Sequence, residues 1–445
     1  MGLKQETYSS LILLLIVMGV TFGNGQTSSI CDNGACDCSP RYRDVTTIEC
    51  KCNAVRKGFS FTDADFGWKF RKVREFYVSD CDESIIFTTN AFKDLGQLES
   101  LHVEKVGKVE FQSGVFQKLV NLSLQNIREL DFGERAFMGA HDLENIKIRG
   151  ATVHQLRSHA LFDIKGLHSL EISDVVVHLI EKDAVNVDLR HPDSQVFIKN
   201  STINNVESNG IVLTANNFSV DKSALDKISP NAIKISSDLI LISESAFGNS
   251  LPNNGINMMA HTINIRNNIF KFLPTGVMEI TKLGNDTKLI FTNNTVHNIQ
   301  IEGPLNRISG IMETAEIRDN HFPCTCILGV LHRSLPNYSR NNFCATRCNI
   351  SFNDFGELVE AEKVCISNNR DPDEAELCRS VTYPTPRSPR EGRMPSYFSK
   401  SPSSTMATVQ PRNSSGRIQV VPVLLFLTLF TVLFETISKI NCKGC

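Results

Sequence analysis

Cysteine is the residue type in this chain whose number and spacing could do chemistry. Fourteen cysteines are present, and a long middle segment between two groups of them has none. The first group is Cys31, Cys36, Cys38, Cys50, Cys52 and Cys81, and the second is Cys324, Cys326, Cys344, Cys348, Cys365 and Cys378. In an exported chain, two even-numbered groups predict disulfides that close each end of the intervening segment.

Metal binding is the alternative chemistry for these cysteines. Cys36 and Cys38, like Cys324 and Cys326, are separated by one residue, which is shorter than the usual spacing of zinc ligands, and the partner histidines of a zinc site are absent. We therefore predict disulfides, with no metal and no cofactor.

The N-terminus indicates that the chain is exported, which disulfides require. Lys4 precedes an apolar run from Leu11 to Val20, and Gly23-Asn24-Gly25 offers small residues for cleavage, so residues 1–25 are predicted to be a signal peptide. Asn-x-Ser/Thr acceptors agree with export and predict glycosylation at Asn121, Asn200, Asn217, Asn285, Asn293, Asn337 and Asn349, with an eighth acceptor at Asn413.

A short phrase recurs in the segment that lies between the two cysteine groups. It reads Leu98-Glu-Ser-Leu101-His-Val103, then Leu143-Glu-Asn-Ile146-Lys-Ile148, then Leu167-His-Ser-Leu170-Glu-Ile172, and Leu122-Ser-Leu124 is an intermediate copy. The period lies in the low twenties. Alternation places the leucines and isoleucines on one face of each short strand, and one repeat cannot bury that face alone, so neighbouring repeats must stack.

These phrases, and the cysteine groups around them, resemble extracellular leucine-rich repeat proteins with cysteine caps. The closest agreement is Asn320-His-Phe322-Pro-Cys324-Thr-Cys326, which resembles the start of the C-terminal cap. The resemblance implies a repeat solenoid, mainly β, with an irregular or short helical convex side. It also implies an N-terminal cap at 26–72, a solenoid at 73–320 and a C-terminal cap at 321–378, with Cys31 bonded to Cys38 and Cys36 to Cys50.

The first strand of the solenoid is expected at Phe76-Tyr77-Val78. Later strands are expected at Leu101, Leu122, Ile146, Leu170, Val196, Ile211, Ile233, Ile263, Leu289 and Ala315. Five positions after each strand begins, the family has Asn or Cys, which Cys81, Asn216, Asn268, Asn294 and Asn320 match and Val106, Ile127, Ala151 and Val175 do not.

The spacing between Val196 and Asn254 leaves the repeat register open. Val196 and Ile211 are too close for a normal repeat of about 20 to 29 residues. The neighbouring Asn-Asn pairs would equally suit a right-handed parallel β-helix, which remains the alternative fold for the middle of the chain.

The C-terminal part is predicted to attach the solenoid to a membrane. Residues 379–417 are rich in Pro, Ser and Thr and are predicted to form a disordered stalk. Residues 418–437 are apolar and fit either a transmembrane helix or the tail of a GPI signal, and residues 438–445 form a short tail in which Cys442 and Cys445 could be acylated.

Catalytic motifs are not apparent in the sequence. It has no Gly-x-Ser-x-Gly, His-Glu-x-x-His or phosphate-binding loop, and we predict that the chain is not an enzyme. The alternative is a β-helix enzyme of the secretory pathway that acts on polysaccharide, with Glu316 and Asp319 as candidate carboxylates. A curved body with strands on one side would favour recognition, whereas a straight three-sided prism with clustered carboxylates would favour the enzyme.

The outward residues of the repeats are the candidate binding surface. The resemblance places them on a concave sheet, and the predicted partner-binding residues are Tyr77, His102, Lys105, Lys147, Arg149, Glu171 and Asp174. Both charge signs are mixed there, which suits a protein partner. Glycans on Asn121, Asn200 and Asn293 would obstruct the middle, so binding is expected between Lys147 and Asp174.

Charge and architecture together define the predicted function. The formal net charge is -2, which argues against nucleic acid as a partner. We predict a glycoprotein on the extracellular face of the plasma membrane, single-pass or GPI-anchored, that binds a protein ligand or cell-surface partner in recognition or adhesion, or as a co-receptor.

Overall fold

The structure is a computed structural model. It describes residues 30–300 except 35, 42–43, 53–57, 63–64, 67, 117, 190, 251, 253, 275–277 and 283–286, and then 315–326, 341–344, 350–351, 353–356 and 378.

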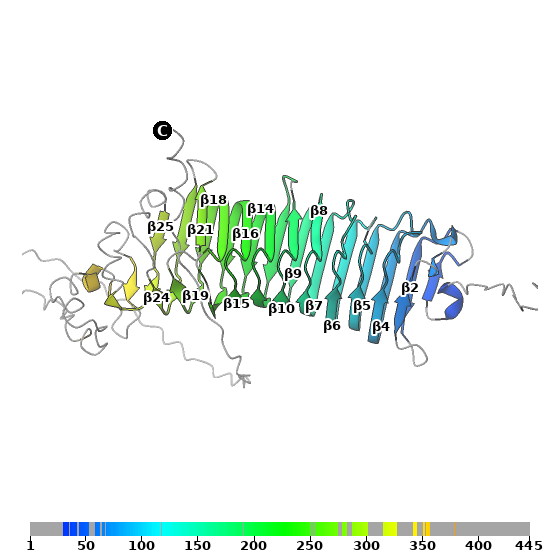
Figure 1. The fold of residues 1–445 in the computed structure, drawn as a ribbon, viewed down its shortest axis with the longest axis horizontal. Helices are drawn as coiled ribbons and strands as arrows, with labels where there is room; N and C mark the ends of the chain where they lie inside the picture. The colour runs from blue at the N-terminus through cyan, green and yellow to red at the C-terminus, as the bar shows by residue number, and fades with distance from the viewer. Residues whose placement is uncertain are drawn as a thin grey trace, which may run out of the picture.

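The described chain winds into a long, nearly straight solenoid whose coils stack along one axis (Figure 1). Each coil places its strands parallel to those of the next coil, and three faces can be distinguished by strand pairing. The predicted repeat solenoid is therefore present. Because the body is straight, the sheet expected to be concave is close to flat.

The first face runs the length of the body. It contains β2 (Thr47–Lys51), the first halves of β4 (Glu75–Phe87), β5 (Ser100–Phe111), β6 (Asn121–Phe132) and β7 (Asn145–Leu156), then β9 (Ser169–Ser173), β12 (Gln195–Lys199), the second halves of β14 (Ile211–Asp221), β16 (Ile233–Ser243) and β18 (Ile256–Arg266), and finally β22 (Lys288–Thr292) and β25 (Ala315–Arg318).

The second face continues from the first around a corner. It contains β3 (Phe59–Phe61), the second halves of β4 to β7, β10 (Val176–Ile180), β13 (Thr202–Val206), β15 (Ala224–Ile228), β17 (Ala246–Ser250), β19 (Ile269–Phe270), β23 (Thr295–Val296), β26 (His321–Phe322) and β27 (Phe343–Cys344).

The third face changes character along the chain. Between β4 and β7 it consists of turns, such as the one at Asn90–Gly96 that buries Ala91, Phe92 and Leu95. From β8 (Leu161–Lys165) onward it is a parallel sheet made of β8, β11 (Val185–Asp188), the first halves of β14, β16 and β18, and β21 (Met278–Lys282). The N-terminal coils thus have the irregular side expected of a leucine-rich repeat, and the middle coils have the three parallel sheets expected of the alternative β-helix.

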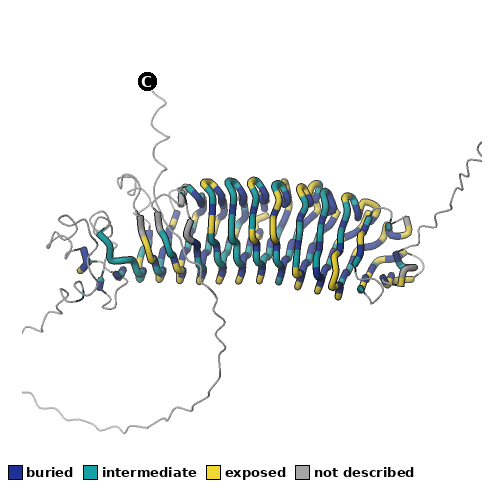
Figure 2. Tube along the Cα trace, turned by 60° about the horizontal axis from the view of Figure 1, so that its bottom comes forward, coloured by how far each residue is buried: buried dark blue, intermediate teal, exposed yellow. Residues whose placement is uncertain are grey.

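Buried residues recur at corresponding places in successive coils (Figure 2). Their apolar side chains stack in columns inside the coils and form the core. In the N-terminal coils one column is aromatic: the ring centroids of Phe87 and Phe111 lie 4.9 Å apart, and those of Phe111 and Phe132 lie 5.6 Å apart. Leu156 and Ile180 continue the same column. In-register stacking of like residues lets each coil bury its inward face against its neighbours.

The predicted strand positions are correct up to Val196 and wrong at two positions after it. On the first face Val196 is followed by Phe218, Ile240 and Ile263. Ile211 and Ile233, expected on this face, lie on the third face instead, where they pair with each other. Each of these coils has one apolar strand on the first face and another on the third face. The prediction assumed one such strand per repeat and placed the third-face strand on the first face.

One residue per coil has a positive φ at the corner between the first and second faces. The residues are Asp80, Lys105, Asn126, Gly150, Asp174, Asn200, Lys222, Glu244, Asn267, Asn293 and Asp319. None of them is β-branched, as expected for the left-handed region, which β-branched side chains tolerate poorly. This column, which we call the left-handed corner, turns every coil in the same place.

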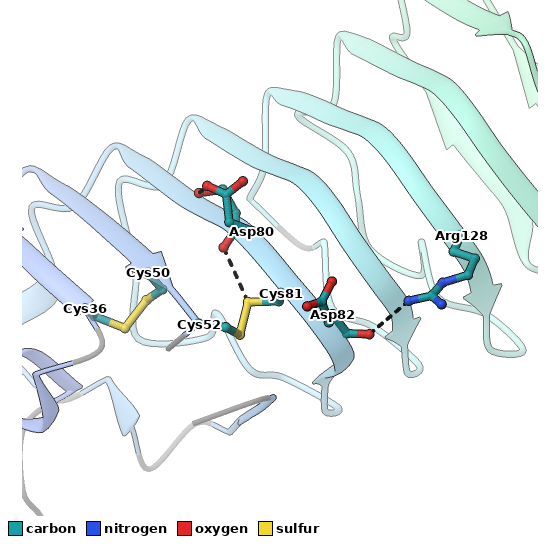
Figure 3. Close-up of a disulfide and its surroundings, with 8 residues drawn as sticks. Cys36, Cys50, Cys52, Asp80, Cys81, Asp82 and Arg128 are labelled. Atoms are coloured by element: carbon teal, nitrogen blue, oxygen red, sulfur yellow. Dashed lines mark hydrogen bonds between the residues drawn. A yellow bond between two sulfur atoms is a disulfide. The ribbon is translucent and has the colours of Figure 1, made fainter. Parts of the chain in front are cut away.

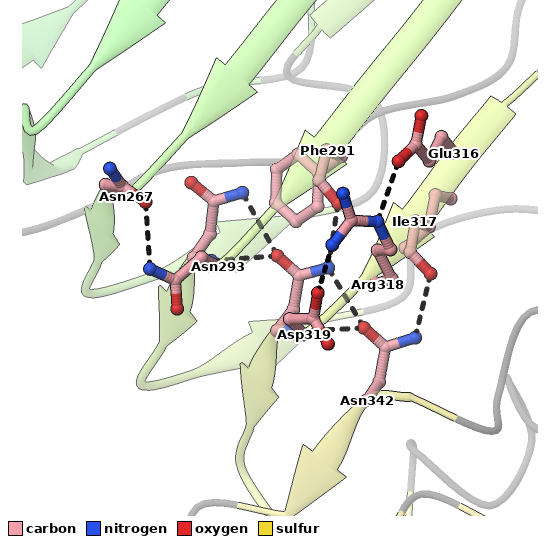
Figure 4. A network of polar contacts seen from close by, with 10 residues as sticks. Asn267, Phe291, Asn293, Glu316, Ile317, Arg318, Asp319 and Asn342 are labelled. Atoms are coloured by element: carbon pink, nitrogen blue, oxygen red, sulfur yellow. Dashed lines mark hydrogen bonds and ion pairs between the residues drawn. The ribbon is translucent and has the colours of Figure 1, made fainter.

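The residue after the left-handed corner points inward and forms the buried ladder that the family resemblance predicted. The ladder runs through Ser201, Ser223, Ser245, Asn268, Asn294, Asn320 and Asn342. The backbone N–H of Asn294 donates to Oδ1 of Asn320 at 2.9 Å, and the Asn320 N–H donates to Oδ1 of Asn342 at 3.1 Å. Figure 4 shows the C-terminal part, in which Asn342 also donates from Nδ2 to the Ile317 carbonyl.

Two corrections to the expected ladder follow. Asn216 is not part of it, because Asn216 precedes the first-face segment of β14 and its N–H donates to Ser194. In the first half, Val106, Ile127 and Ala151 occupy the ladder position with no polar side chain. There β5, β6 and β7 run through the corner as continuous strands, and these three residues are paired in register, so the sheet itself satisfies the backbone.

Three disulfides close the N-terminal end. Figure 3 shows two of them, Cys36–Cys50 and Cys52–Cys81. Cys31 bonds to Cys38 and Cys36 to Cys50, which are the two pairs that the resemblance implied. The third joins Cys52 to Cys81, and Cys81 occupies the first ladder position. The Cys36–Cys50 bond ties β1 (Cys36–Ser39) to β2, with which it pairs antiparallel, so the cap covers the open end of the first sheet.

Part of the C-terminal cap is described. Cys326 and Cys378 are each disulfide-bonded. Cys324 and Cys344 had been predicted to be disulfide-bonded, but they are thiols in the structure. The hydrogen bond between them, with burial, raises the pKa of Cys344. Cys348, Cys365, Cys442 and Cys445 lie outside the described residues, as do the signal peptide, the stalk and residues 418–437. No helix within the described part of the chain is long and apolar enough to cross a membrane.

Candidate partner-binding face

The first face brings together all seven residues predicted to bind a partner. Tyr77, His102, Lys147 and Glu171 share one outward row, with Ser123 between His102 and Lys147. Arg149 lies two residues farther along β7, and Lys105 and Asp174 belong to the left-handed corner. The seven residues therefore form one continuous surface over β4 to β9.

An aromatic pair marks the N-terminal part of this surface. The rings of Tyr77 and His102 stack with centroids 4.6 Å apart and planes 8° apart, and the Tyr77 hydroxyl donates to Glu75 at 3.2 Å. Burial lowers the pKa of His102, and the nearby Glu75 carboxylate partly offsets that effect. Burial, followed by Glu75, raises the pKa of Tyr77. Both rings are consequently neutral at pH 7 and offer an uncharged, half-buried contact.

Charged pairs between coils make up the rest of the surface. Lys147 Nζ lies 2.8 Å from Glu171 Oε2, and Arg149 Nε lies 3.5 Å from Asp174 Oδ2. Lys105 lies 3.8 Å from Asp80 of the preceding coil and 2.9 Å from Glu104 of its own coil. Solvent-exposed pairs of this kind contribute only about 0 to 1 kcal/mol each to stability. They can therefore exchange partners with an incoming protein at little cost to the fold.

The described sequon asparagines border the same face. Asn121 lies at the start of β6, where Nδ2 donates to Ser100 at 3.2 Å and Oδ1 accepts from Asn145 at 2.8 Å. Asn200 and Asn293 lie on the left-handed corner, with Nδ2 donating to Asp174 and to Asn267 respectively. Asn217 is exposed at the start of the first-face segment of β14. Asn285, Asn337 and Asn349 lie outside the described residues.

The register correction adds two residues to the first face that sequence reasoning missed. Leu239 and Leu241 point outward from the first-face segment of β16, whereas the strand had been expected at Ile233. Leu239 is 38 % exposed, and it is the one exposed large hydrophobic residue on the first face within the described chain. The signal was present in the sequence, since Ile240 lies 22 residues after Phe218, which in turn lies 22 after Val196.

The carboxylates considered for catalysis are engaged with arginine. Arg318 Nε lies 2.7 Å from Glu316 Oε1, and its Nη1 pairs with Asp319 (Figure 4). The hydrogen bond from Arg318 is the main cause of a lowered pKa of Glu316. A carboxylate held in its charged form is poorly suited to donate a proton as a general acid.

Histidines and metal ligands show no convergence in the described chain. His154 stacks on His178 on the second face at 5.3 Å, and His168 lies against His191 at 4.2 Å. No group of three or more His, Cys, Asp or Glu side chains among the described residues is arranged to hold a metal ion.

Comparison with known families agrees with the coil geometry. The family model described as BspA type leucine rich repeat region matches residues 74–188 and 196–312 in six copies, which together make up just over half of the chain. None of the curated proteins compared with the chain matches it. The matched residues begin just before β4 and follow the stacked coils along the chain. The chain therefore belongs to the BspA type leucine rich repeat family.

Proposed function

We propose that this protein is a cell-surface scaffold that binds a protein partner through the first face of its solenoid and performs no catalysis. The observation that carries the proposal is the surface over β4 to β9, where a neutral Tyr77–His102 stack adjoins charge pairs of both signs. Mixed charges give specificity through complementary pairing, and a buried aromatic contact gives affinity.

Export and membrane attachment are part of the same proposal. The three disulfides at the N-terminal end suit an oxidising compartment. Residues 1–25 are proposed as the signal peptide. Residues 418–437 are proposed as the anchor, either as a transmembrane helix or as a GPI signal, which leaves the solenoid outside the cell in recognition, adhesion or a co-receptor complex.

A charge-reversal experiment tests the binding surface. Cells displaying the full chain are probed for capture of surface proteins from other cells, and the captured partner is then titrated against variants. Lys147→Glu combined with Arg149→Glu breaks two charge pairs on the first face, and we expect affinity to fall at least tenfold. The matched control combines Lys165→Glu with Lys234→Glu, which places two charge reversals on the third face. Equal binding by both variants would remove the first face from the proposal.

The β-helix enzyme keeps one favourable observation, which is the straight body with three parallel sheets from β8 onward. Its candidate carboxylates oppose it, because both pair with Arg318. Incubating the purified chain with acidic and neutral polysaccharides separates the two functions: release of shortened sugars that is lost in Glu316→Gln would support the enzyme.

A further inference from the structure

We propose that Asn217 carries an N-linked glycan whose first sugars lie over Leu239 and Leu241 and cover the apolar spot on the first face. This inference rests on the proposed export of the chain, since the modification occurs in the secretory pathway. It goes beyond that function by assigning an occupant to one region of the face.

The register places the acceptor beside the apolar spot. Asn217 on β14 is paired directly with Leu239 on β16, and Ser219 is paired with Leu241. Neighbouring strands lie about 4.8 Å apart. A sugar attached to Asn217 therefore starts one strand away from Leu239, well within the length of the first two sugar rings.

Strand alternation presents the whole acceptor motif to solvent. Phe218 points into the core, so Asn217 and Ser219 both point outward from the same face, and Asn217 is exposed. The hydroxyl and the amide that the transferase must recognise are thus on the open side of the sheet.

The side-chain amide of Asn217 is also the least engaged. Among the four sequon asparagines in the described residues, Asn121, Asn200 and Asn293 each donate Nδ2 to a neighbouring side chain. Asn217 Nδ2 makes no such bond within the described chain, so attaching a sugar there breaks no contact of the fold.

The apolar spot formed by Leu239 and Leu241 favours packing of the glycan against the sheet. Leu239 is 38 % exposed and Leu241 is half-buried beside it, and the outward Phe197 and Ile290 are half-buried farther along the same row of the first face. Exposed apolar patches on sheets promote association with other chains. The C–H face of a sugar ring removes such a patch from water while its hydroxyls remain solvated.

The transfer itself is chemically balanced. The donor is an oligosaccharide linked through a diphosphate to a polyprenyl lipid. The bond between sugar C1 and the diphosphate oxygen breaks, the bond between C1 and Asn217 Nδ2 forms, and one amide proton leaves with the diphosphate.

Two measurements on the full chain from secretory cells test the inference. Glycopeptide mass spectrometry should show a glycan on Asn217. Asn217→Gln and Ser219→Ala should both raise the binding of a hydrophobic dye severalfold, because they abolish the motif from either side. Adding Leu239→Ser and Leu241→Ser to either variant should return dye binding to the level of the glycosylated wild-type chain.

The outcomes separate this inference from the proposed export. A bare Asn217 in a chain whose other sequons are glycosylated would overturn the inference alone, as would dye binding that does not change when the glycan is lost. A chain with no glycan at any sequon would overturn the proposed export, and the inference with it.

Discussion

The side chain at each ladder position determines which backbone groups find hydrogen-bond partners next to the left-handed corner. Ser201, Ser223 and Ser245 accept from the backbone of the preceding coil and donate to a carbonyl two residues earlier in their own chain. From Asn268 onward the longer amide also reaches a carbonyl of the preceding coil. Both residue types satisfy buried backbone groups, which are costly when unpaired.

Removing one member of the ladder should therefore lower the free energy of unfolding. Asn268→Ala leaves the Ser245 N–H and the Ile242 carbonyl without their partners, and we expect a loss of about 2–3 kcal/mol in denaturant unfolding. Asn268→Ser keeps a donor and an acceptor and should lose about half as much. Asn267→Gly, at the exposed left-handed corner, is the matched control and should change stability by less than about 1 kcal/mol; similar losses in all three variants would contradict the ladder's role.

His102 provides a test of pH dependence at the same scale. Its pKa in the folded chain lies below the ordinary value of 6.5 because it is buried against Tyr77. The unfolded chain then binds the proton more readily, so the stability contributed by neutral His102 is complete above about pH 6.5 and is lost as the pH falls through the lowered pKa.

Nuclear magnetic resonance titration can follow that imidazole directly. Tyr77→Ala exposes the ring and should move the pKa of His102 up toward its ordinary value. Glu75→Gln removes a carboxylate that raises the pKa and should move it further down. A downward shift, or no shift, of the His102 pKa in Tyr77→Ala would show that burial is not the cause.

At the scale of strands and turns, close contact between coils leaves no room for a side chain at Gly107. A Cβ there would lie 1.9 Å from the Asp82 carbonyl oxygen and 2.9 Å from Arg128 Nη2. Arg128 reaches past the glycine to donate to that same carbonyl at 3.1 Å (Figure 3).

Gly107→Ala should accordingly push β5 away from β4 and lower the free energy of unfolding by about 2–4 kcal/mol. The control is Gly96→Ala, where a Cβ meets nothing within 4 Å, and which should be neutral or slightly stabilising. Thermal melting of the two variants is sufficient, and a tolerated Gly107→Ala would mean that the coils are less tightly spaced than described.

The strands were predictable wherever one apolar phrase occurs per coil. Leu101, Ile146 and Leu170 are on the first face as their phrases predict. The prediction was wrong at Ile211 and Ile233 because an apolar alternating segment also forms the third face there, and spacing alone cannot say which of two strands continues a sheet. The ladder residues Ser201, Ser223 and Ser245 were missed because the family pattern expects Asn or Cys, whereas these serines also accept from the backbone of the preceding coil.

The place of the candidate face was predictable where the strands were. Alternation within correctly placed strands puts Tyr77, His102, Lys147, Arg149 and Glu171 on the outward side of the first face, and Lys105 and Asp174 lie at its corner. That these residues bind a partner stays a prediction. Leu239 and Leu241 could not be found in the same way, since their strand had been assigned to the wrong coil position. Their pairing with Asn217 is a property of three-dimensional register, which a list of sequons does not contain.

For the whole molecule, the stacked coils make stability depend on neighbours and on the covered ends. Replacing Cys36 and Cys50 with serine removes a bond that spans 14 residues and should cost about 3 kcal/mol. Amide hydrogen exchange should show early loss of protection in β2 and β4, with β16 and β18 unchanged. The Cys31–Cys38 pair, which spans 7 residues, is the control and should have the smaller effect; uniform loss of protection along the body would contradict the end-cap role.

The corner between the first and second faces also has a mechanical consequence. N-terminal coils pass that corner as unbroken strands, whereas coils from Ser201 onward are linked there by single side chains that lie 22 to 26 residues apart. A tether pulled by its C-terminal end would peel one coil at a time, and each coil would lengthen it by roughly 7 to 9 nm. If it is anchored at a cell surface as proposed, such a chain would lengthen stepwise under tension while its disulfide-bonded N-terminal end stays folded.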